Sequence, residues 1–371
     1  MRGARRFVFG IGMAAFIAVV AGALMAPPAG AATFVYVGNA ESNEVYVLQL
    51  NQQNGDLTVV DKTPIPGIEK PGISTPMSVS PDRRFLYVGT RGEPKVAAGF
   101  AIDPSTGKLK FVASGPLADS LAYIATDRTG RFLLGASYPG HRVTVNPISS
   151  PGKVLPPQEV LENYPNAHSI FADGANRFVL VPTLGNDRIN QFAFDATTGK
   201  LTPTASPAAE ARPKAGPRHF VYHPGGKLVY VIGELDGNVY VFDYNAASGD
   251  LTQKQVVSAL PADFQGKPSA ADLHITPNGK FLYGSERTTS TLAGFQVDPA
   301  KGTLTPIGSV PTEKQPRGFG IDPSGRYLLA VGQLSHGLSS YSIDQTSGKL
   351  TKLKEYPMGK NPNWVEILDL P

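Results

Sequence analysis

Cysteine is absent from this chain of 371 residues, which excludes disulfide bonds, thiolate metal ligands and cysteine nucleophiles. Its six histidines are scattered, and no His/Asp cluster has the spacing of a metal site. A Gly-rich nucleotide loop and a serine nucleophile elbow are missing as well. The sequence therefore implies no metal and no cofactor.

Concentrated positive charge is also missing. The net charge is +4 and the pI is about 9.0, but lysines and arginines are dispersed and no basic run is interleaved with aromatic residues. A nucleic-acid surface needs such a run, so we expect no nucleic-acid partner.

Long apolar runs are absent except at the N-terminus. Residues 1–6 are cationic, residues 7–25 are almost wholly apolar, and Ala29-Gly30-Ala31 offers a small-x-small cleavage site before Ala32. This pattern predicts a signal peptide over 1–31 and an exported protein, periplasmic or secreted, with no stable membrane association after cleavage. The alternative is an uncleaved membrane anchor, since about nineteen apolar residues are long enough to span a bilayer.

Turn-forming residues are abundant, with 40 glycines and 33 prolines, and they recur with a period. A motif of Gly, a polar residue and then Leu or Val occurs seven times, 45 to 53 residues apart, at Gly55, Gly107, Gly152, Gly199, Gly249, Gly302 and Gly348. A hairpin turn of the Pro-Asp-Gly type recurs independently with the same period, at residues 81–84, 127–130, 173–176, 224–227, 277–279 and 323–325. This period is within the range of propeller blades.

Each repeat reads as four short strands with alternating apolar residues, and no mature segment has helical periodicity. The fold class predicted is therefore all-β: a seven-bladed β-propeller with four antiparallel strands per blade, forming a single domain over residues 32–371. We expect residues 34–62 to supply three strands of one blade and residues 363–368 the fourth, so that the N- and C-terminal strands close the ring and remove its free edge.

One hairpin, residues 216–234, suggests where chemistry could occur. Apolar runs at 219–223 and 228–232 flank its turn, so antiparallel pairing brings Arg218 and Glu234 to the same edge of the sheet. The same reasoning, applied to every blade, predicts the side chains at one mouth of the central channel. These are Thr75, Ala122, His168, Arg218, His219, Asp272, Arg317 and Asn363 from first strands, and Asn39, Arg91, Ser137, Thr183, Glu234, Arg287 and Gln333 from second strands.

Four arginines in this set need an anionic partner, and guanidinium groups suit carboxylate or phosphate. His168 is either a general base or acid, or a hydrogen-bonded channel histidine. Glu234 is either catalytic or a salt-bridge partner of Arg218. His219 and His223 are about 13 Å apart on an extended strand, so they cannot chelate one metal ion together.

The mature chain resembles the seven-bladed propeller lactonases, typified by bacterial 6-phosphogluconolactonase and fungal carboxy-muconate cycloisomerase. The resemblance covers Phe34 to Leu368 and is carried most specifically by AGPRH (215–219), DLHITPNG (272–279), PTEKQPRGF (311–319) and AVGQLSH (330–336). The family's proposed quartet of a histidine, two arginines and a glutamate corresponds here to His168, Arg218, Arg287 and Glu234.

This resemblance implies hydrolysis of a small anionic sugar-acid lactone without a metal ion, or ring closure as in the cycloisomerase branch. His168, Glu234, Arg218 and Arg287 would then be catalytic. Substrate binding is assigned to Arg317, His219, Arg91, Asp272 and Gln333. A different class of function remains open, namely an exported propeller that binds an anion or a partner without catalysis. Nothing in the sequence indicates an oligomeric state.

Overall fold

The computed structural model describes Met1 and residues 31–150 and 152–371. Residues 2–30, which hold nearly all of the predicted signal peptide, lie outside the described residues, so that prediction stays untested. Within the described part, no helix is long and apolar enough to cross a membrane.

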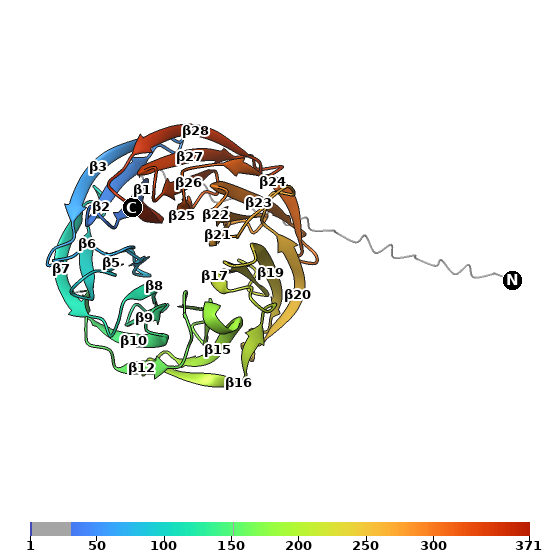
Figure 1. Cartoon of the computed structure of the whole chain (residues 1–371), viewed down its shortest axis with the longest axis horizontal. Helices are drawn as coiled ribbons and strands as arrows, with labels where there is room; N and C mark the ends of the chain where they lie inside the picture. Colours follow the sequence, from blue (N-terminus) through green and yellow to red (C-terminus); the bar gives the residue numbers. More distant parts are fainter. Residues whose placement is uncertain (2–30, 151) are drawn as a thin grey trace.

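The described residues form seven antiparallel sheets arranged as blades around a central opening (Figure 1). From inside to outside, the first blade built from one continuous stretch of chain consists of β4 (Met77–Val79), β5 (Phe85–Gly89), β6 (Val96–Ile102) and β7 (Leu109–Pro116). The second consists of β8 (Leu121–Thr126), β9 (Phe132–Ser137) and β10 (Arg142–Ser149), with β11 (Lys153–Val154) and β12 (Glu159–Glu162) outside them. The third consists of β13 (Phe171–Ala172), β14 (Phe178–Thr183), β15 (Arg188–Asp195) and β16 (Lys200–Glu210).

The next three blades follow the same order. They are β17 (Pro217–Tyr222), β18 (Leu228–Gly233), β19 (Asn238–Tyr244) and β20 (Leu251–Ser258); β21 (Ala270–Ile275), β22 (Phe281–Glu286), β23 (Thr291–Val297) and β24 (Leu304–Pro311); β25 (Pro316–Ile321), β26 (Tyr327–Gly332), β27 (Gly337–Ile343) and β28 (Leu350–Pro357).

Both chain ends build the seventh blade. Its order is β29 (Pro362–Leu370), β1 (Ala32–Asn39), β2 (Glu44–Leu50) and β3 (Leu57–Pro64), with Val37 paired to Val365. The C-terminal strand is therefore the innermost one, inside the ring beside β1 (Figure 1). The predicted seven-bladed propeller and its closure by shared terminal strands are confirmed.

Two details differ from a uniform repeat of four strands. The outer strand of the β8–β12 blade is split, because β11 and β12 pair with different parts of β10. The expected inner strand after His168 is reduced to two residues, β13, and β14 is followed by a single 3₁₀ turn, η1 (Leu184–Asn186). Short-range sequence patterns do not show how far a strand stays paired with its neighbour.

The glycine of the sevenfold motif locks adjacent blades together. Gly107 has a φ of +68°, and a Cβ added there would lie 2.3 Å from a ring carbon of Phe34 in the neighbouring blade. Its carbonyl oxygen accepts a hydrogen bond from the Tyr36 hydroxyl at 2.8 Å. Gly302 and Gly348 receive the same bond from Tyr230 and Tyr283. Only glycine meets both the dihedral and the packing requirement, which explains why the motif recurs.

The hairpin turns between first and second strands are closed by a repeated side-chain bond. Asp127, with no exposed surface, accepts the backbone N–H groups of Arg131 and Phe132 at 2.9 Å. The equivalent acceptors in other blades are Ser80, Asp173, Thr276 and Asp322. We call this side of the ring the turn end, and the opposite side, where first strands begin, the mouth.

Candidate active site

One extra residue interrupts pairing where first strands begin. Leu121 pairs with Ser137 and Tyr123 with Ala136, which leaves Ala122 without an opposite residue. Arg317 and Asn363 are extra residues of the same kind. In two further blades, a pair of residues on the first strand lies opposite a single residue of the second strand; the pairs are Arg218 with His219 and Ala271 with Asp272. Residues 168–170 face only residues 181–182, since the flanking bridges join Ala167 to Thr183 and Phe171 to Leu180.

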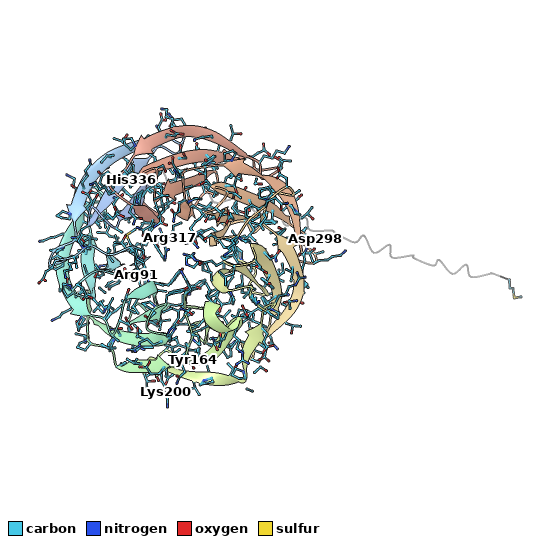
Figure 2. The ribbon with its side chains drawn as sticks, viewed as in Figure 1. Arg91, Tyr164, Lys200, Asp298, Arg317 and His336 are labelled. Carbon is cyan, nitrogen blue, oxygen red and sulfur yellow. The ribbon has the colours of Figure 1, made fainter. Side chains whose placement is uncertain are left out.

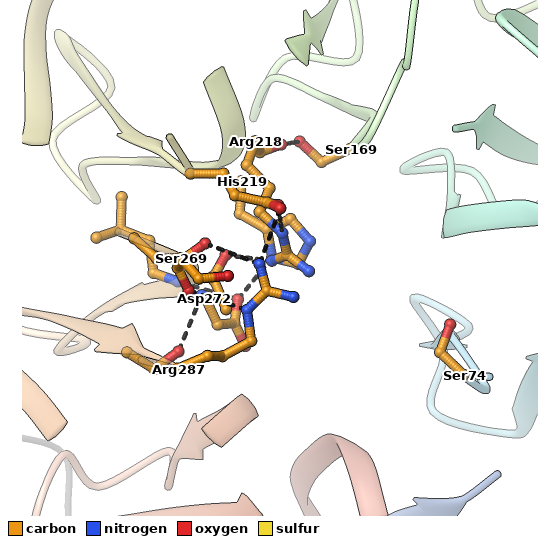
Figure 3. A network of polar contacts seen from close by, with 12 residues as sticks. Ser74, Ser169, Arg218, His219, Ser269, Asp272 and Arg287 are labelled. Atoms are coloured by element: carbon orange, nitrogen blue, oxygen red, sulfur yellow. Dashed lines mark hydrogen bonds and ion pairs between the residues drawn. The ribbon is translucent and has the colours of Figure 1, made fainter. Parts of the chain in front are cut away.

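A bulge re-aims side chains that regular alternation would direct into the interface between blades. Arg218 and His219, adjacent in sequence, both belong to the mouth cluster for this reason. Figure 3 shows Arg218, His219, Asp272 and Arg287 together on one side of the opening, with Ser74 on the other. These four sequence-predicted residues, from two neighbouring blades, are thus brought to one place.

Glu234 is held between two arginines. Its Oε2 lies 2.8 Å from Arg218 Nε and its Oε1 lies 2.9 Å from Arg287 Nη2. The Nε contact is ionic, because the Arg218 N–H has no acceptor in hydrogen-bonding geometry. Arg218 Nη1 also donates to the Ala271 carbonyl, and Arg287 Nε donates to the Ser269 carbonyl at 2.9 Å.

These contacts set the protonation of Glu234 and Arg218. Burial would raise the pKa of Glu234, but Arg218 and Arg287 more than offset it, so the net pKa is lowered and the carboxylate is ionised. Burial lowers the pKa of Arg218 to about 10, with Arg287 adding to the shift and Glu234 opposing it, so the guanidinium is still charged at neutral pH. Of the two readings of Glu234, the geometry therefore favours the salt-bridge partner.

Arg91 and Arg317 lack such neutralisation. Arg91 donates from Nε to the Ser120 hydroxyl at 3.1 Å and from Nη1 to the Ser74 hydroxyl at 3.5 Å. Within the described ranges, Arg317 makes no ion pair and no side-chain hydrogen bond. Burial lowers the pKa of Arg317 well below its usual value, and Arg218, Arg287 and Arg91 lower it further. Both lie beside the central opening (Figure 2), so this cationic pair is available to an anion.

His168 is buried, 3% exposed, and its Nδ1 has no hydrogen-bond partner among the described residues. Burial holds its pKa well below 6.5, and Arg218, His219, Arg317 and Arg91 lower it further. The ring is consequently neutral at physiological pH, with one nitrogen able to accept a proton.

His219 is oriented by a carboxylate from the next blade. Its Nδ1 is 2.7 Å from Asp272 Oδ1, while its Nε2 is buried without a partner in the part of the chain that the structure describes. Burial and Arg218 lower the pKa of His219 to about 4, although Asp272 opposes them. Asp272 Oδ2 is also 3.2 Å from His274 Nε2.

Not every predicted residue joins this cluster. The Gln333 side-chain amide donates to Asn361 Oδ1 at 2.8 Å, and the Ser137 hydroxyl donates to the Ser120 carbonyl at 3.0 Å. Asn363 donates to the Asn361 carbonyl and accepts from the Thr75 N–H. These groups are occupied by local bonds, and the role of Gln333 in substrate binding stays a prediction.

Sequence reasoning missed Tyr123, Trp364 and Glu366. The rings of Tyr123 and Trp364 pack against His219, with centroids 5.2 and 6.1 Å away. Burial raises the pKa of Glu366 to about 7, and Trp364 Nε1 donates to it at 2.9 Å. Tyr123 and Trp364 each follow directly the residue that the inventory took from their strand, Ala122 and Asn363, and Glu366 lies two residues further along β29. In residues 31–150 and 152–371, no three His, Asp or Glu side chains are grouped so as to hold a metal ion.

Comparisons with known proteins show which proteins this chain is similar to. The family model described as lactonase, 7-bladed beta-propeller, matches residues 34–367. The 6-phosphogluconolactonase of Serratia proteamaculans is 43% identical over 288 residues, which cover 78% of this chain and 84% of that protein, and its counterpart from Pectobacterium carotovorum is 42% identical with the same coverage. The periplasmic gluconolactonase of Pseudomonas aeruginosa superposes with a TM-score of 0.83 at 26% identity, covering 92% of this chain and 100% of that one.

Proposed function

This chain belongs to the seven-bladed β-propeller lactonase family, and from that membership we propose that it is an exported, metal-independent enzyme that hydrolyses an anionic sugar-acid lactone. It is a lactonase of the 6-phosphogluconolactonase type, a carboxylic ester hydrolase. One observation supports the proposed mechanism most directly: His168, Arg218, Glu234 and Arg287 come from three neighbouring blades and meet at one mouth.

The chemical step needs a base for water and a cation for the developing oxyanion. His168 takes a proton from water, the hydroxide adds to the lactone carbonyl carbon, and negative charge forms on the carbonyl oxygen. Arg218 and Arg287 face that oxygen with a fixed positive field. The bond between the carbonyl carbon and the ring oxygen then breaks, and the proton on His168 passes to the departing ring oxygen. Atoms and charge balance without a metal ion.

Glu234 acts through the two arginines. With a lowered pKa and both oxygens engaged, it is a weak base, but it holds Arg218 and Arg287 against their mutual repulsion. Removal of its charge would let the guanidinium groups separate and would lose the aligned field.

The anionic part of the substrate binds Arg317 and Arg91. A phosphate or carboxylate there would satisfy the guanidinium of Arg317 and supplement the hydroxyl contacts of Arg91. This arrangement suits a phosphorylated lactone, such as the 6-phosphogluconolactone implied by the names of the Serratia and Pectobacterium relatives. A negative charge there would also weaken the field that lowers the pKa of His168, and so strengthen the base when substrate is bound.

Export is supported by the cationic and apolar pattern of residues 1–31 and by the word periplasmic in the name of the Pseudomonas relative. N-terminal sequencing of the protein recovered from the periplasm or medium tests it. A mature chain beginning at Ala32 is expected, and an intact Met1 on a membrane-bound protein would contradict it.

The lactonase proposal is tested by initial rates above spontaneous opening for a panel of sugar lactones, phosphorylated and not, with and without EDTA. We expect catalysis that EDTA leaves unchanged, and losses of about 10²-fold or more in His168→Asn and Glu234→Gln. Full activity in both variants would refute the mechanism. Reversible binding without turnover would instead indicate a binding module, and lactone formation from a muconate would indicate the cycloisomerase branch.

A further inference from the structure

Two buried ring nitrogens lie on neighbouring histidines and have no partner. These are Nδ1 of His168 and Nε2 of His219, and neither makes a hydrogen bond within the described residues. The two ring centroids are 5.1 Å apart, with an angle of 62° between the planes. An unpaired buried polar atom costs about 1–3 kcal/mol, so two such atoms on adjacent rings call for an explanation.

The spacing itself suggests one. A hydrogen bond of ~2.9 Å between nitrogens on facing edges of two imidazoles puts the ring centres about 5 Å apart. The observed centroid separation matches that value, so a His168 ring turned with Nδ1 toward His219 would bring the two nitrogens to hydrogen-bonding distance. A single N–H···N bond would then satisfy both atoms.

The direction of that bond follows from Asp272. Its Oδ1 accepts from the Leu273 N–H at 2.9 Å and its Oδ2 accepts from the Phe319 N–H at 3.2 Å, so the carboxylate is fixed in place and acts as an acceptor. His219 Nδ1, 2.7 Å from Oδ1, must therefore carry the proton. Its Nε2 is left as an unprotonated acceptor, buried and without a partner in the described residues.

Packing keeps His219 in that orientation. Its ring is 5% exposed and meets the edges of Tyr123 and Trp364, from two other blades. On the other side, the His168 ring packs against Tyr138, with centroids 5.7 Å apart. The charged groups that influence His168 are Arg218, Arg317 and Arg91, all cationic, and none of them can accept a proton from it.

We propose that His168, His219 and Asp272 form a hydrogen-bond relay, in which His219 and Asp272 are positioning residues that place the proton of His168 on Nδ1 and leave its Nε2 free as the base. This rests on the proposed lactonase function. When Nε2 takes a proton from water, His168 becomes an imidazolium that donates its Nδ1–H to His219 Nε2. No proton leaves His168 until the ring oxygen of the substrate departs, so His219 and Asp272 are unchanged at the end of the cycle.

The first test measures tautomers in the resting enzyme by ¹⁵N-detected NMR of the imidazoles, without substrate. Both His168 and His219 are expected in the Nδ1–H form with an unprotonated Nε2, and the His168 tautomer should become mixed in His219→Leu. A His168 that carries its proton on Nε2 in the wild type would overturn the relay. The NMR measurement does not depend on turnover. If the protein hydrolyses no lactone, the proposed function is refuted, but the tautomers of His168 and His219 still test the relay.

The second test compares two replacements of similar size. His219→Gln keeps an oxygen acceptor for the His168 proton, whereas His219→Leu has none. We expect kcat to fall about 10²-fold in the leucine variant, with KM within about twofold, and to recover most of that loss in the glutamine variant. Equal losses in both would show that His219 only fills space, which contradicts the proposal.

His223→Gln is the control, because His223 lies on the same hairpin at the turn end, where its Nδ1 accepts the Gly225 N–H. Its activity and the His168 tautomer should match the wild type. Asp272→Asn tests the role of Asp272 in the relay. In this variant the tautomer of His219 should change and kcat should fall. An unchanged kcat with a changed His219 tautomer would overturn the role of Asp272.

Discussion

The two ends of the inner hairpins differ in how their polar groups are satisfied. At the turn end, Ser80, Asp127, Asp173, Thr276 and Asp322 repeat one bond, in which a side-chain oxygen accepts the backbone N–H that starts the second strand. At the mouth, bulges interrupt the pairing, cations outnumber carboxylates, and ring nitrogens of His168 and His219 lack partners.

This difference separates stability from function within the same strands. At the turn end, local side chains satisfy the N–H groups that begin the second strands of five blades. The mouth leaves groups unsatisfied that a substrate would satisfy, and it gathers like charges that destabilise the empty protein. Unsatisfied and strained groups of this kind concentrate at functional sites.

The sharpest way to separate the two ends is to remove one arginine from each. Arg218→Gln at the mouth should reduce kcat/KM about 10³-fold, because it removes one of two cations that face the developing oxyanion. Arg177→Gln at the turn end, an exposed arginine stacked on Phe178, should change kcat/KM less than twofold. Steady-state rates on the best lactone of the panel measure both.

Arg218 is fully buried, so its variant needs a check of folding. Circular dichroism and thermal unfolding should show a closed propeller. Arg287 is less buried than Arg218, so Arg287→Gln provides a second measurement of the loss in kcat/KM when one of these two cations is removed. Wild-type rates in both folded variants would contradict the assignment of the oxyanion-facing cations.

The turn end can be broken without touching the chemistry. Asp127→Ala removes acceptors of the Arg131 and Phe132 N–H groups and also the bond from Asn176 Nδ2 at 2.9 Å. We expect a loss of about 3 kcal/mol in the free energy of unfolding, because several buried donors are left unpaired. Denaturant titration measures it, and kcat/KM at low temperature should be unchanged. A large loss of activity in the folded variant would show that the two ends are coupled.

Within the mouth, Arg317→Gln tests the unpaired cation. KM for a phosphorylated lactone should rise about tenfold or more, while KM for its unphosphorylated analogue should change little. The pH profile provides a second readout. Because Arg317 helps to lower the pKa of His168, its removal raises that pKa, and the rate should begin to fall at a higher pH as the solution is acidified. Equal effects on both lactones would argue against an anion subsite.

Glu366, inside the channel, gives the smallest expected effect. Its pKa in the fold is about 7, above the usual 4.5, so the folded state holds the proton more tightly than the unfolded state. The resulting stabilisation is complete below about 4.5 and is lost as the pH rises through 7. Solvent in the channel reduces the effect, and we expect about 1–2 kcal/mol between pH 5 and pH 9.

Glu366→Gln should remove that pH dependence, as thermal unfolding across the same range would show. Glu355→Gln on the exposed edge of β28 is the matched control and should leave the dependence intact. Parallel pH curves for the wild type and Glu366→Gln would contradict the prediction.

Periodicity in the sequence was sufficient to predict the propeller and its closure, because the sevenfold glycine motif and the hairpin turn recur with the same period. Antiparallel pairing was also sufficient to place Arg218 and Glu234 at one edge, a contact that the structure shows. These predictions succeed because they use only neighbours along the chain or across one hairpin.

Contacts between blades were beyond such reasoning. Asp272 meets His219, and Trp364 packs on the same ring, only because bulges on three inner strands rotate side chains toward the channel. A bulge adds one residue without a distinctive composition, and it reverses the expected alternation after it. The pairing of Glu234 with Arg287, from a different blade, depends on the same distances between blades.

The closing blade has a consequence for synthesis. β29 is the innermost strand of that blade, and its Trp364 packs on His219. A ribosome that has released the six blades between β4 and β28 has therefore not yet produced a closed ring. The ring closes only when the last strand docks beside the first, so this blade can be completed only after nearly the whole chain has been synthesised.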